Sequence, residues 1–333
     1  MAIKVNNDSD TNSEVFGGDA NFNPSPSDSS NAYSNDAVEP VDETVSQDGG
    51  SDDFEAKTVT QHAGLSSEEL NDPNSIKVTL SDPKTPVVVL YGPPSCGKTM
   101  MLVRMTRYLK KKGYTVSPDT NFRPTHDTNY RQLCENFDEM INSNNAARST
   151  SNISFMLVKV LKNGKPVCQI LEAPGEFYFN PDAPKRDYPA YVHEIIGSQN
   201  RKVWAIMVEP DWSDWAPRKN YVDRITRLTS MQASHDRTIF VYNKIDLTPY
   251  VRKQGQVDVK SAITQVEQLY PGIFASFINT NPITKLWKAY NCEFVPFMTG
   301  SYSQTMRGEQ TYTESHESYA DKLWKAILEQ IKG

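Results

Sequence analysis

The residues most able to do chemistry lie between an apolar run and an amphipathic segment. Residues 87–91 read VVVLY, and residues 92–99 read GPPSCGKT. Two glycines allow tight turns that bring backbone N–H groups close to an anion, a lysine adds a mobile charge, and a threonine adds a hydroxyl ligand for Mg²⁺. We therefore predict a phosphate-binding loop for a nucleotide, formed by Gly92, Pro94, Ser95, Cys96, Gly97, Lys98 and Thr99.

The elements on either side of this loop fit that prediction. The β-branched run before it predicts a strand. After it, apolar residues recur at helical spacing, and Gly113 stands where a helix C-terminus favours a left-handed residue. A strand before the loop and a helix after it argue against a chance glycine-rich turn.

Three further polar stretches follow predicted strands. Residues 171–176 read LEAPGE, residues 243–246 read NKID, and residues 298–301 read MTGS. Ligands of open α/β sheets bind beyond the carboxyl ends of the strands, so we expect these stretches to lie beside the phosphate-binding loop.

In this order the chain resembles the P-loop GTPases of the translation-factor and Ras-like class, over about residues 85–330. The resemblance implies an α/β fold: a three-layer P-loop NTPase with a mostly parallel sheet and one antiparallel β-hairpin at its edge. It implies GTP or GDP and Mg²⁺ as cofactors. It also implies a molecular switch with slow GTPase activity.

The resemblance assigns the base to the last two stretches. Asp246 would accept the guanine N1–H and 2-amino donors, a donor pair that adenine lacks. Asn243 would brace the phosphate-binding loop, and the stem of Lys244 would cover the base. Thr299 and Gly300 would form the loop in which a backbone N–H meets the guanine O6.

The resemblance assigns the triphosphate end to residues that depart in part from the family pattern. Gly175 would donate its N–H to the γ-phosphate. Glu172 stands where the family usually has Asp, the residue that holds Mg²⁺ through water. Glu176 stands where Ras-like members have a Gln that orients the attacking water, and Pro94 replaces a glycine close to that water. The catalytic assignments are Lys98, Glu176 and Thr150, and the departures at Glu176 and Pro94 predict slow hydrolysis.

Thr150 is the candidate for the first switch threonine, which would join Thr99 and Glu172 at Mg²⁺. It stands directly before the first strand of a predicted hairpin. Ser149 and Thr125 are rivals, and an ordinary loop threonine is an equal alternative. Arg148 could act as an arginine finger, although a solvated arginine is favoured.

Two other functions stay open. The sequence GPPxxGKT also resembles the loop of AAA-type ATPases, although an antiparallel hairpin would replace their helical crossover and NKID would have no role. A non-hydrolysing GTP-binding interaction module is the third alternative, because Glu172 and Glu176 replace the usual residues. The aromatic residues 177–179 could form a face for a protein effector in the loop 172–190, or pack beneath it. Trp212 and Trp215 could contact a partner, although packing is favoured.

Composition divides the chain near residue 75. Residues 1–74 hold 16 acidic and 2 basic residues, and such a stretch cannot bury enough surface to offset its ordering entropy. We predict a disordered acidic tail (1–74) and a GTPase domain (75–333). The domain holds 33 basic and 25 acidic residues without a dense basic cluster interleaved with aromatics, so no nucleic-acid motif is indicated.

The four cysteines stand far apart, and no stretch approaches the length of a membrane span, so we expect a cytoplasmic protein with reduced thiols. Asn163-Gly164 between apolar runs predicts a type I′ hairpin. The remaining pattern predicts strands at 75–81, 87–91, 153–161, 166–171, 203–208, 238–242 and 294–298 and helices at 128–141, 189–196, 220–231, 257–270 and 315–331. Residues 247–292 have no predicted role.

Overall fold

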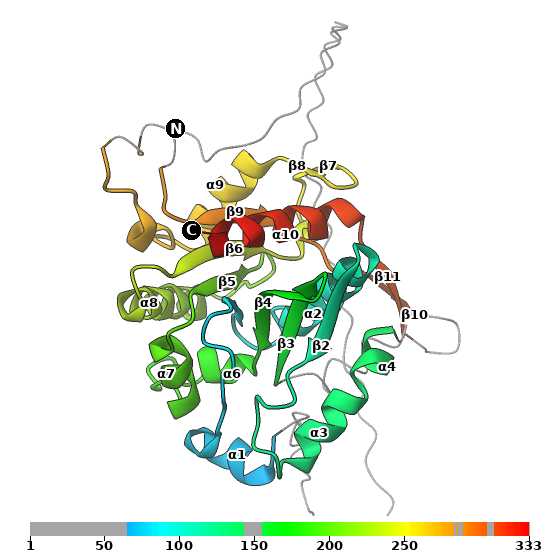
Figure 1. Ribbon diagram of the computed structural model, residues 1–333. Helices are drawn as coiled ribbons and strands as arrows, with labels where there is room; N and C mark the ends of the chain where they lie inside the picture. The colour runs from blue at the N-terminus through cyan, green and yellow to red at the C-terminus, as the bar shows by residue number, and fades with distance from the viewer. Residues whose placement is uncertain (1–64, 143–154, 283–284, 286–288, 305–309, 333) are drawn as a thin grey trace, which may run out of the picture. The chain divides into compact units, whose positions relative to one another are not determined.

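The computed structural model describes residues 65–142, 155–282, 285, 289–304 and 310–332. In this part of the chain, seven strands form one sheet in the order β2-β3-β4-β1-β5-β6-β9 (Figure 1). From β4 to β9 neighbouring strands are parallel, whereas β3 runs antiparallel to β2 and β4. The strands are β1 (Val87–Tyr91), β2 (Tyr114–Pro118), β3 (Met156–Lys162), β4 (Lys165–Glu172), β5 (Lys202–Val208), β6 (Arg237–Tyr242) and β9 (Glu293–Pro296).

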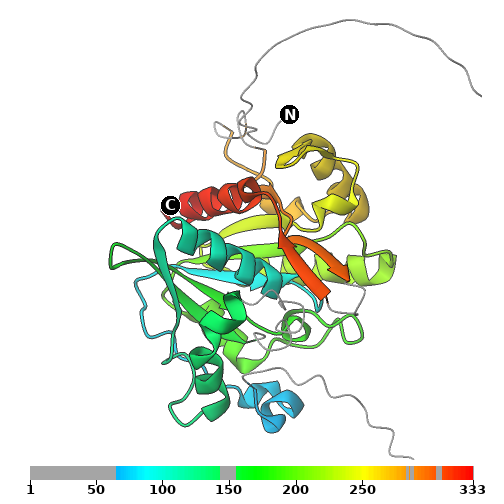
Figure 2. The ribbon, with the colours of Figure 1, turned by 90° about the vertical axis from the view of Figure 1, so that its right-hand side faces the viewer.

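Helices cover both faces of this sheet. The helix that follows the phosphate-binding loop, α2 (Lys98–Lys111), lies beside the last helix, α10 (Glu317–Lys332), on one face (Figure 2). The other face carries α8 (Trp215–Met231), whose Tyr221 donates a hydrogen bond to the Met207 carbonyl of β5. The predicted three-layer α/β fold with a mostly parallel sheet is therefore confirmed.

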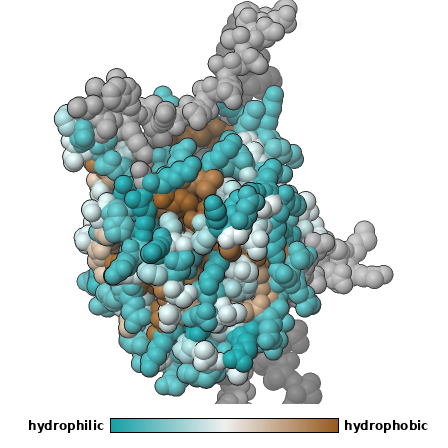
Figure 3. Space-filling view, in the orientation of Figure 1, coloured by the Kyte–Doolittle hydropathy of each residue, from teal (hydrophilic) through white to brown (hydrophobic). Residues whose placement is uncertain are grey.

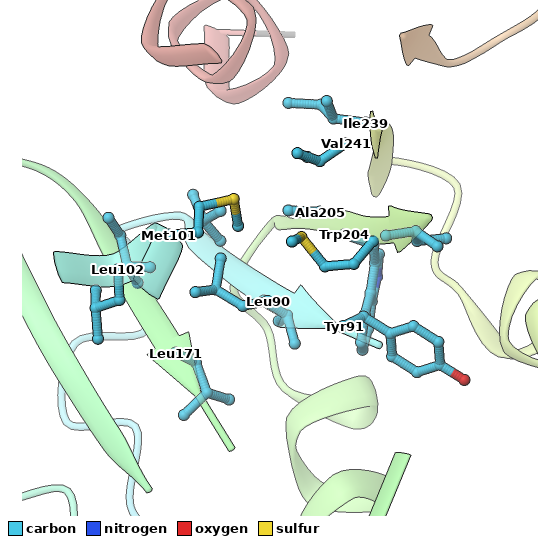
Figure 4. Packing of buried hydrophobic residues seen from close by; sticks show 14 of the residues in the cluster. Leu90, Tyr91, Met101, Leu102, Leu171, Trp204, Ala205, Ile239 and Val241 are labelled. Carbon is cyan, nitrogen blue, oxygen red and sulfur yellow. The ribbon is translucent and has the colours of Figure 1, made fainter. Parts of the chain in front are cut away.

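The central strand β1 is buried along its whole length because of these two layers. Leu90 points toward Met101 and Leu102 of α2, whereas the neighbouring Tyr91 points to the opposite side (Figure 4). There the ring of Tyr91 stacks on Tyr221 of α8, with 6.3 Å between the ring centroids. The end of β1, and with it the loop that follows, is fixed from both faces of the sheet.

The predicted hairpin between β3 and β4 is also confirmed. Asn163 and Gly164 have φ values of 51° and 74°, the left-handed conformation that a type I′ turn requires at both positions. This places the antiparallel β3 where a helical crossover would stand in the alternative ATPase fold.

The remaining elements are short. The helices are α1 (Ser67–Asn71), α3 (Thr128–Glu135), α4 (Phe137–Asn142), α6 (Gly175–Tyr178), α7 (Ala190–Gly197) and α9 (Val259–Leu269), with 3-10 turns η1 (Pro73–Ser75), η3 (Ile245–Leu247) and η4 (Ala275–Phe277). Two antiparallel pairs lie outside the main sheet: β7 (Val251–Lys253) with β8 (Gln256–Val257), and β10 (Gly300–Gln304) with β11 (Gln310–Glu314).

One predicted strand is wrong. Residues 75–81 alternate between buried or half-buried and exposed side chains, but they form no strand. Ile76 enters the core, and Thr79 donates its N–H to the Phe122 carbonyl without a continuing ladder. The alternation therefore reflects one-sided packing of an extended segment. The edge of the main sheet next to β3 is formed instead by β2, a strand that the sequence did not predict.

The face in Figure 3 is mostly hydrophilic, with apolar side chains confined to patches. Among the described residues, no helix is long and apolar enough to cross a membrane. All four cysteines are free thiols.

Candidate nucleotide-binding site

The candidate site lies at one edge of the sheet. The parallel strands β1, β4, β6 and β9 all point their carboxyl ends to this edge, and each is followed by one of the four polar stretches singled out in the sequence. The strand order thus brings together segments that lie far apart in the chain, where open α/β sheets bind their ligands.

The loop after β1 has the backbone geometry of an anion cradle. Gly97, with φ 91°, caps the N-terminus of α2, and Ser95 also has a positive φ of 62°. Lys98 is only 5% exposed, and its ammonium donates to the carbonyls of Gly92 (3.1 Å) and Pro93 (2.9 Å). The lysine charge is therefore held within the loop, beside the N-terminus of the helix.

Cys96 contributes no charge to this cradle. Burial raises the pKa of its thiol to about 11, so the thiol is neutral at physiological pH. Its sulfur also restricts the size of the residue at position 92, because a Cβ added to Gly92 would lie 2.7 Å from the Cys96 Sγ. Gly92 is needed here for close approach.

The segment after β4 packs directly on the phosphate-binding loop. A Cβ added to Gly175 would lie 2.3 Å from both the Pro93 carbonyl carbon and the Pro94 nitrogen. Only glycine allows this approach of two backbones. The residue that we predicted to meet the γ-phosphate therefore lies against the phosphate-binding loop.

Glu172 and Thr99 meet at the same place. The Thr99 hydroxyl donates to the Glu172 Oε1 at 2.8 Å, and the other carboxylate oxygen is buried without a hydrogen-bond partner in the described part of the chain. Burial raises the pKa of Glu172 to about 8, although the Lys98 charge and the Thr99 hydroxyl act in the opposite direction. An unpartnered carboxylate oxygen next to a threonine hydroxyl is a donor set that suits Mg²⁺.

The described residues hold no group of three or more His, Cys, Asp or Glu side chains that could hold a metal by themselves. A Mg²⁺ ion here would thus depend on phosphate oxygens and water for its other ligands, as is usual for Mg²⁺ at phosphate sites. Thr150, the other predicted ligand, and its neighbours Arg148 and Ser149 lie outside the described residues. The rival Thr125 is exposed on the segment before α3.

The loop 172–190 does not present its aromatic residues to solvent. Phe177, Tyr178 and Phe179 are at most 6% exposed, and Glu176 before them is half-buried at the start of α6. Of the two alternatives for these aromatics, the structure therefore shows packing beneath the loop. Trp212 likewise packs against Phe179, whereas Trp215 is 60% exposed.

A buried arginine of α8 holds the same loop. Arg224 donates to the carbonyls of Tyr178 (2.8 Å) and Arg186 (2.6 Å), and its guanidinium lies 3.6 Å from the ring centroid of Tyr188. The hydroxyl of Tyr188 bonds that of Tyr91, the last residue before the phosphate-binding loop. The loop is thus held through its backbone carbonyls by Arg224 of α8 and through the Tyr188 side chain by the end of β1.

The stretch after β6 contacts the phosphate-binding loop directly. Asn243 is 2% exposed, and its Nδ2 donates to the Cys96 carbonyl at 3.0 Å. A Cβ added to Gly97 would lie 2.4 Å from that nitrogen. Asn243 thereby joins the end of β6 to the phosphate-binding loop. Asp246 lies nearby in η3 with its side chain exposed.

Lys244 has two carboxylate partners that the sequence analysis missed. Its ammonium lies 2.7 Å from a Glu209 oxygen and 2.9 Å from an Asp211 oxygen, both after β5, while its backbone takes the left-handed conformation (φ 53°). These two acidic residues follow a predicted strand at the ligand-binding edge of the sheet, and that position could have indicated a role in the site. The partners direct the lysine stem, which we predicted to cover the base.

The last stretch begins the β10–β11 hairpin. The Thr299 carbonyl accepts from the Tyr312 hydroxyl (2.8 Å) and from the Ser315 N–H (3.2 Å). Gly300, the residue after Thr299, pairs with Glu314 of β11. Hydrogen-bonded and non-hydrogen-bonded pairs alternate in antiparallel strands, so the Gly300 N–H points away from β11.

Strand order, phosphate-binding loop and hairpin together form the three-layer α/β arrangement that the sequence predicted for a P-loop nucleotide-binding protein, with the NKID stretch at the same edge of the sheet and glutamates at positions 172 and 176.

Comparison with known proteins adds the following. No model of a known protein family matches the chain. The urease accessory protein UreG of Ureaplasma parvum is 25% identical over 213 residues, which span 60% of this chain and 89% of UreG. Among solved structures, a putative nucleolar GTP-binding protein 1 from Plasmodium falciparum aligns with a TM-score of 0.35 and 13% identity, over 76% of this chain and 89% of that one.

Proposed function

We propose that this protein is a guanine-nucleotide switch that binds GTP with Mg²⁺ and hydrolyses it slowly. The observation that carries the proposal is the bond from the Asn243 amide to the Cys96 carbonyl. It joins the stretch that would read the base to the loop that would hold the phosphates. A protein that ignored the base would not need this connection.

The predicted roles divide along the nucleotide. Lys98 and the N–H groups of residues 92–99 would bind the β- and γ-phosphates. Thr99, Thr150 and, through water, Glu172 would hold Mg²⁺, which would neutralise charge on the phosphates and orient them. Asp246 would read the guanine edge.

Slow hydrolysis follows from the charge of Glu176. A carboxylate beside the γ-phosphate repels it and lacks the N–H donors with which a glutamine orients water. The loop 172–190 would change its order between the GTP and GDP states and contact a protein effector. Because residues 177–179 are buried, that contact would use other residues of the loop in the conformation described here.

A nucleotide titration tests the choice of base. The full chain is titrated with fluorescent GTP, GDP and ATP in the presence of Mg²⁺. We expect guanine nucleotides to bind at least about tenfold more tightly than ATP, a difference of 1.4 kcal/mol. ATP binding as tight as GTP binding would contradict the proposal and favour the ATPase alternative.

Single-turnover hydrolysis tests the switch against the non-hydrolysing module. Phosphate release from bound GTP is followed for the natural chain and for Lys98→Ala, which removes the charge held at the loop. We expect slow release that exceeds the Lys98→Ala background. GTP binding without release above that background would assign the protein a structural use of GTP, the alternative that Glu172 and Glu176 favour.

A further inference from the structure

The β10–β11 hairpin is anchored to the helix that starts at the phosphate-binding loop. Arg104 of α2 is 2% exposed, and it donates from Nη2 to the Ser315 carbonyl at 3.0 Å. The Ser315 hydroxyl in turn donates to the Met298 carbonyl at 2.6 Å. One buried side chain thus connects the helix to the segment that precedes Gly300.

A carboxylate between three cations strengthens this anchor. Glu314 lies 3.2 Å from Arg104, 3.2 Å from Arg107 and 3.0 Å from Lys111, all on α2. Burial acts to raise the pKa of Glu314, but the three cations hold it below its ordinary value, so the carboxylate is ionised. The hairpin is therefore fixed on α2 by charge as well as by hydrogen bonds.

Tyr312, also on β11, completes the connection. Its side chain packs against Met100 of α2, and its hydroxyl donates to the Thr299 carbonyl at 2.8 Å. With the bond from the Ser315 N–H, the Thr299 carbonyl has two donors, which fix the plane of the Thr299–Gly300 peptide. The N–H of Gly300 belongs to the same peptide, so its direction is fixed too.

We propose that Tyr312, Ser315 and Arg104 are positioning residues for guanine specificity. They hold the Gly300 N–H toward the base oxygen O6, and they attach it to α2, the helix that starts at the phosphate-binding loop. This inference rests on the proposed guanine-nucleotide site. It assigns the hairpin and the buried arginine to base selection, a role that fold stability alone would not require.

The test pairs a variant that lacks one hydroxyl with a nucleotide that lacks one acceptor. Tyr312→Phe removes the bond to the Thr299 carbonyl, and 6-thio-GDP replaces O6 with sulfur, a much weaker acceptor. Dissociation constants of the full chain are measured for both nucleotides. We expect Tyr312→Phe to weaken GDP binding about fivefold and 6-thio-GDP binding less than twofold, because the misplaced donor matters only where O6 is present.

A matched control separates positioning from stability. Tyr130 is also buried and donates to a backbone carbonyl, that of Asp119, at 2.8 Å. Tyr130→Phe should leave the preference for GDP over 6-thio-GDP unchanged. Ser315→Ala, which frees the Met298 carbonyl, serves as the second positioning variant and should reproduce the Tyr312→Phe pattern.

The outcomes distinguish this inference from the proposed function. Equal losses for GDP and 6-thio-GDP in both positioning variants, or no loss for either nucleotide, would overturn the inference while GDP binding by the natural chain stands. Failure of the natural chain to prefer GDP over ADP would overturn the proposed function itself. Losses confined to GDP would support both.

Discussion

The proposed base end and the proposed γ-phosphate end of the site are built in different ways. At the base end, Asn243 bonds the phosphate-binding loop, and Tyr312 and Ser315 fix the Thr299 carbonyl. These residues keep the family pattern or support it from outside. At the other end, Glu172 has a buried oxygen without a partner, and Glu176 replaces a neutral amide.

This difference determines what the site is suited to do. Donors and acceptors fixed before binding reduce the ordering cost of the ligand, so the base end favours tight and selective binding. A buried carboxylate without a partner is unfavourable until a cation or a proton neutralises it. The proposed γ-phosphate end would therefore depend on what is bound, as the proposed switch requires.

The largest expected effect is at the base end. Asp246→Asn should weaken GDP binding by about 100-fold or more, because hydrogen bonds to a charged group contribute about 1.5–3 kcal/mol each and two would be lost or altered. The new amide can donate to the carbonyl at C2 of xanthine, so XDP binding should improve. Competition titrations with GDP, XDP and ADP measure both changes. Unchanged GDP affinity would remove Asp246 from the base site.

The second prediction concerns Glu172 in the protein without nucleotide or metal. Its folded pKa of about 8 exceeds the ordinary value of 4.5, so the folded state binds the proton more tightly. The contribution to stability is then full below pH 4.5 and is lost as the pH rises to about 8. Glu172→Gln removes this loss.

Urea unfolding in EDTA at pH 5 and pH 8 measures that effect. Between these values the natural chain should lose roughly 2–4 kcal/mol more stability than Glu172→Gln, an order-of-magnitude figure from the size of the pKa shift. In a separate titration, the variant should also show a weaker dependence of GTP affinity on Mg²⁺. Parallel stability profiles for the two proteins would mean that Glu172 is solvated or paired in solution.

Local chemistry explains which parts of this site could be predicted from the sequence. The turn at Asn163 and Gly164 needs left-handed backbone at both residues, and few other residue pairs supply it. The phosphate-binding loop likewise carries its own signal in its glycines, its lysine and the helix that follows. The alternation of helices and strands predicted a mostly parallel sheet but not the order of its strands.

What the sequence did not predict depends on distant partners. The edge strand β2 has only one fully buried residue, Val116, and exists because β3 pairs with it. The carboxylates of Glu209 and Asp211 acquire a role only when the sheet brings Lys244 beside them. The alternation of buried and exposed side chains at residues 75–81 led to a wrong strand prediction, because a segment can bury one side without forming hydrogen bonds to a neighbouring strand.

The third prediction tests the γ-phosphate end. Glu176→Gln removes a negative charge and restores the amide of Ras-like members, so single-turnover GTP hydrolysis should accelerate on the order of tenfold, about 1.4 kcal/mol in the barrier. Glu194→Gln, an exposed carboxylate on α7, is the matched control and should leave the rate unchanged. A slower reaction in Glu176→Gln would instead make Glu176 the base that activates water.

The smallest effect is expected for a change at Arg224, which holds the loop 172–190 through backbone carbonyls. Arg224→Lys keeps the charge but loses the fork that reaches the carbonyls of Tyr178 and Arg186 together. Trypsin cleavage after Lys185 and Arg186 should then accelerate about two- to threefold in the GDP state, while GDP affinity stays unchanged, since among the described residues no hydrogen bond of the Arg224 side chain involves the proposed base end.

Arg218→Lys is the control for this cleavage assay, because Arg218 lies on the same helix and bonds the carbonyls of Ser213 and Asp214 rather than the loop. If Arg224→Lys altered GDP affinity as much as cleavage, the two ends of the site would share one rigid unit. The contrast between a fixed base end and a conditional γ-phosphate end would then fail. If cleavage alone increases, the loop moves independently of the base end. The conformation of the loop could then follow the state of the phosphates while the contacts to guanine stay the same.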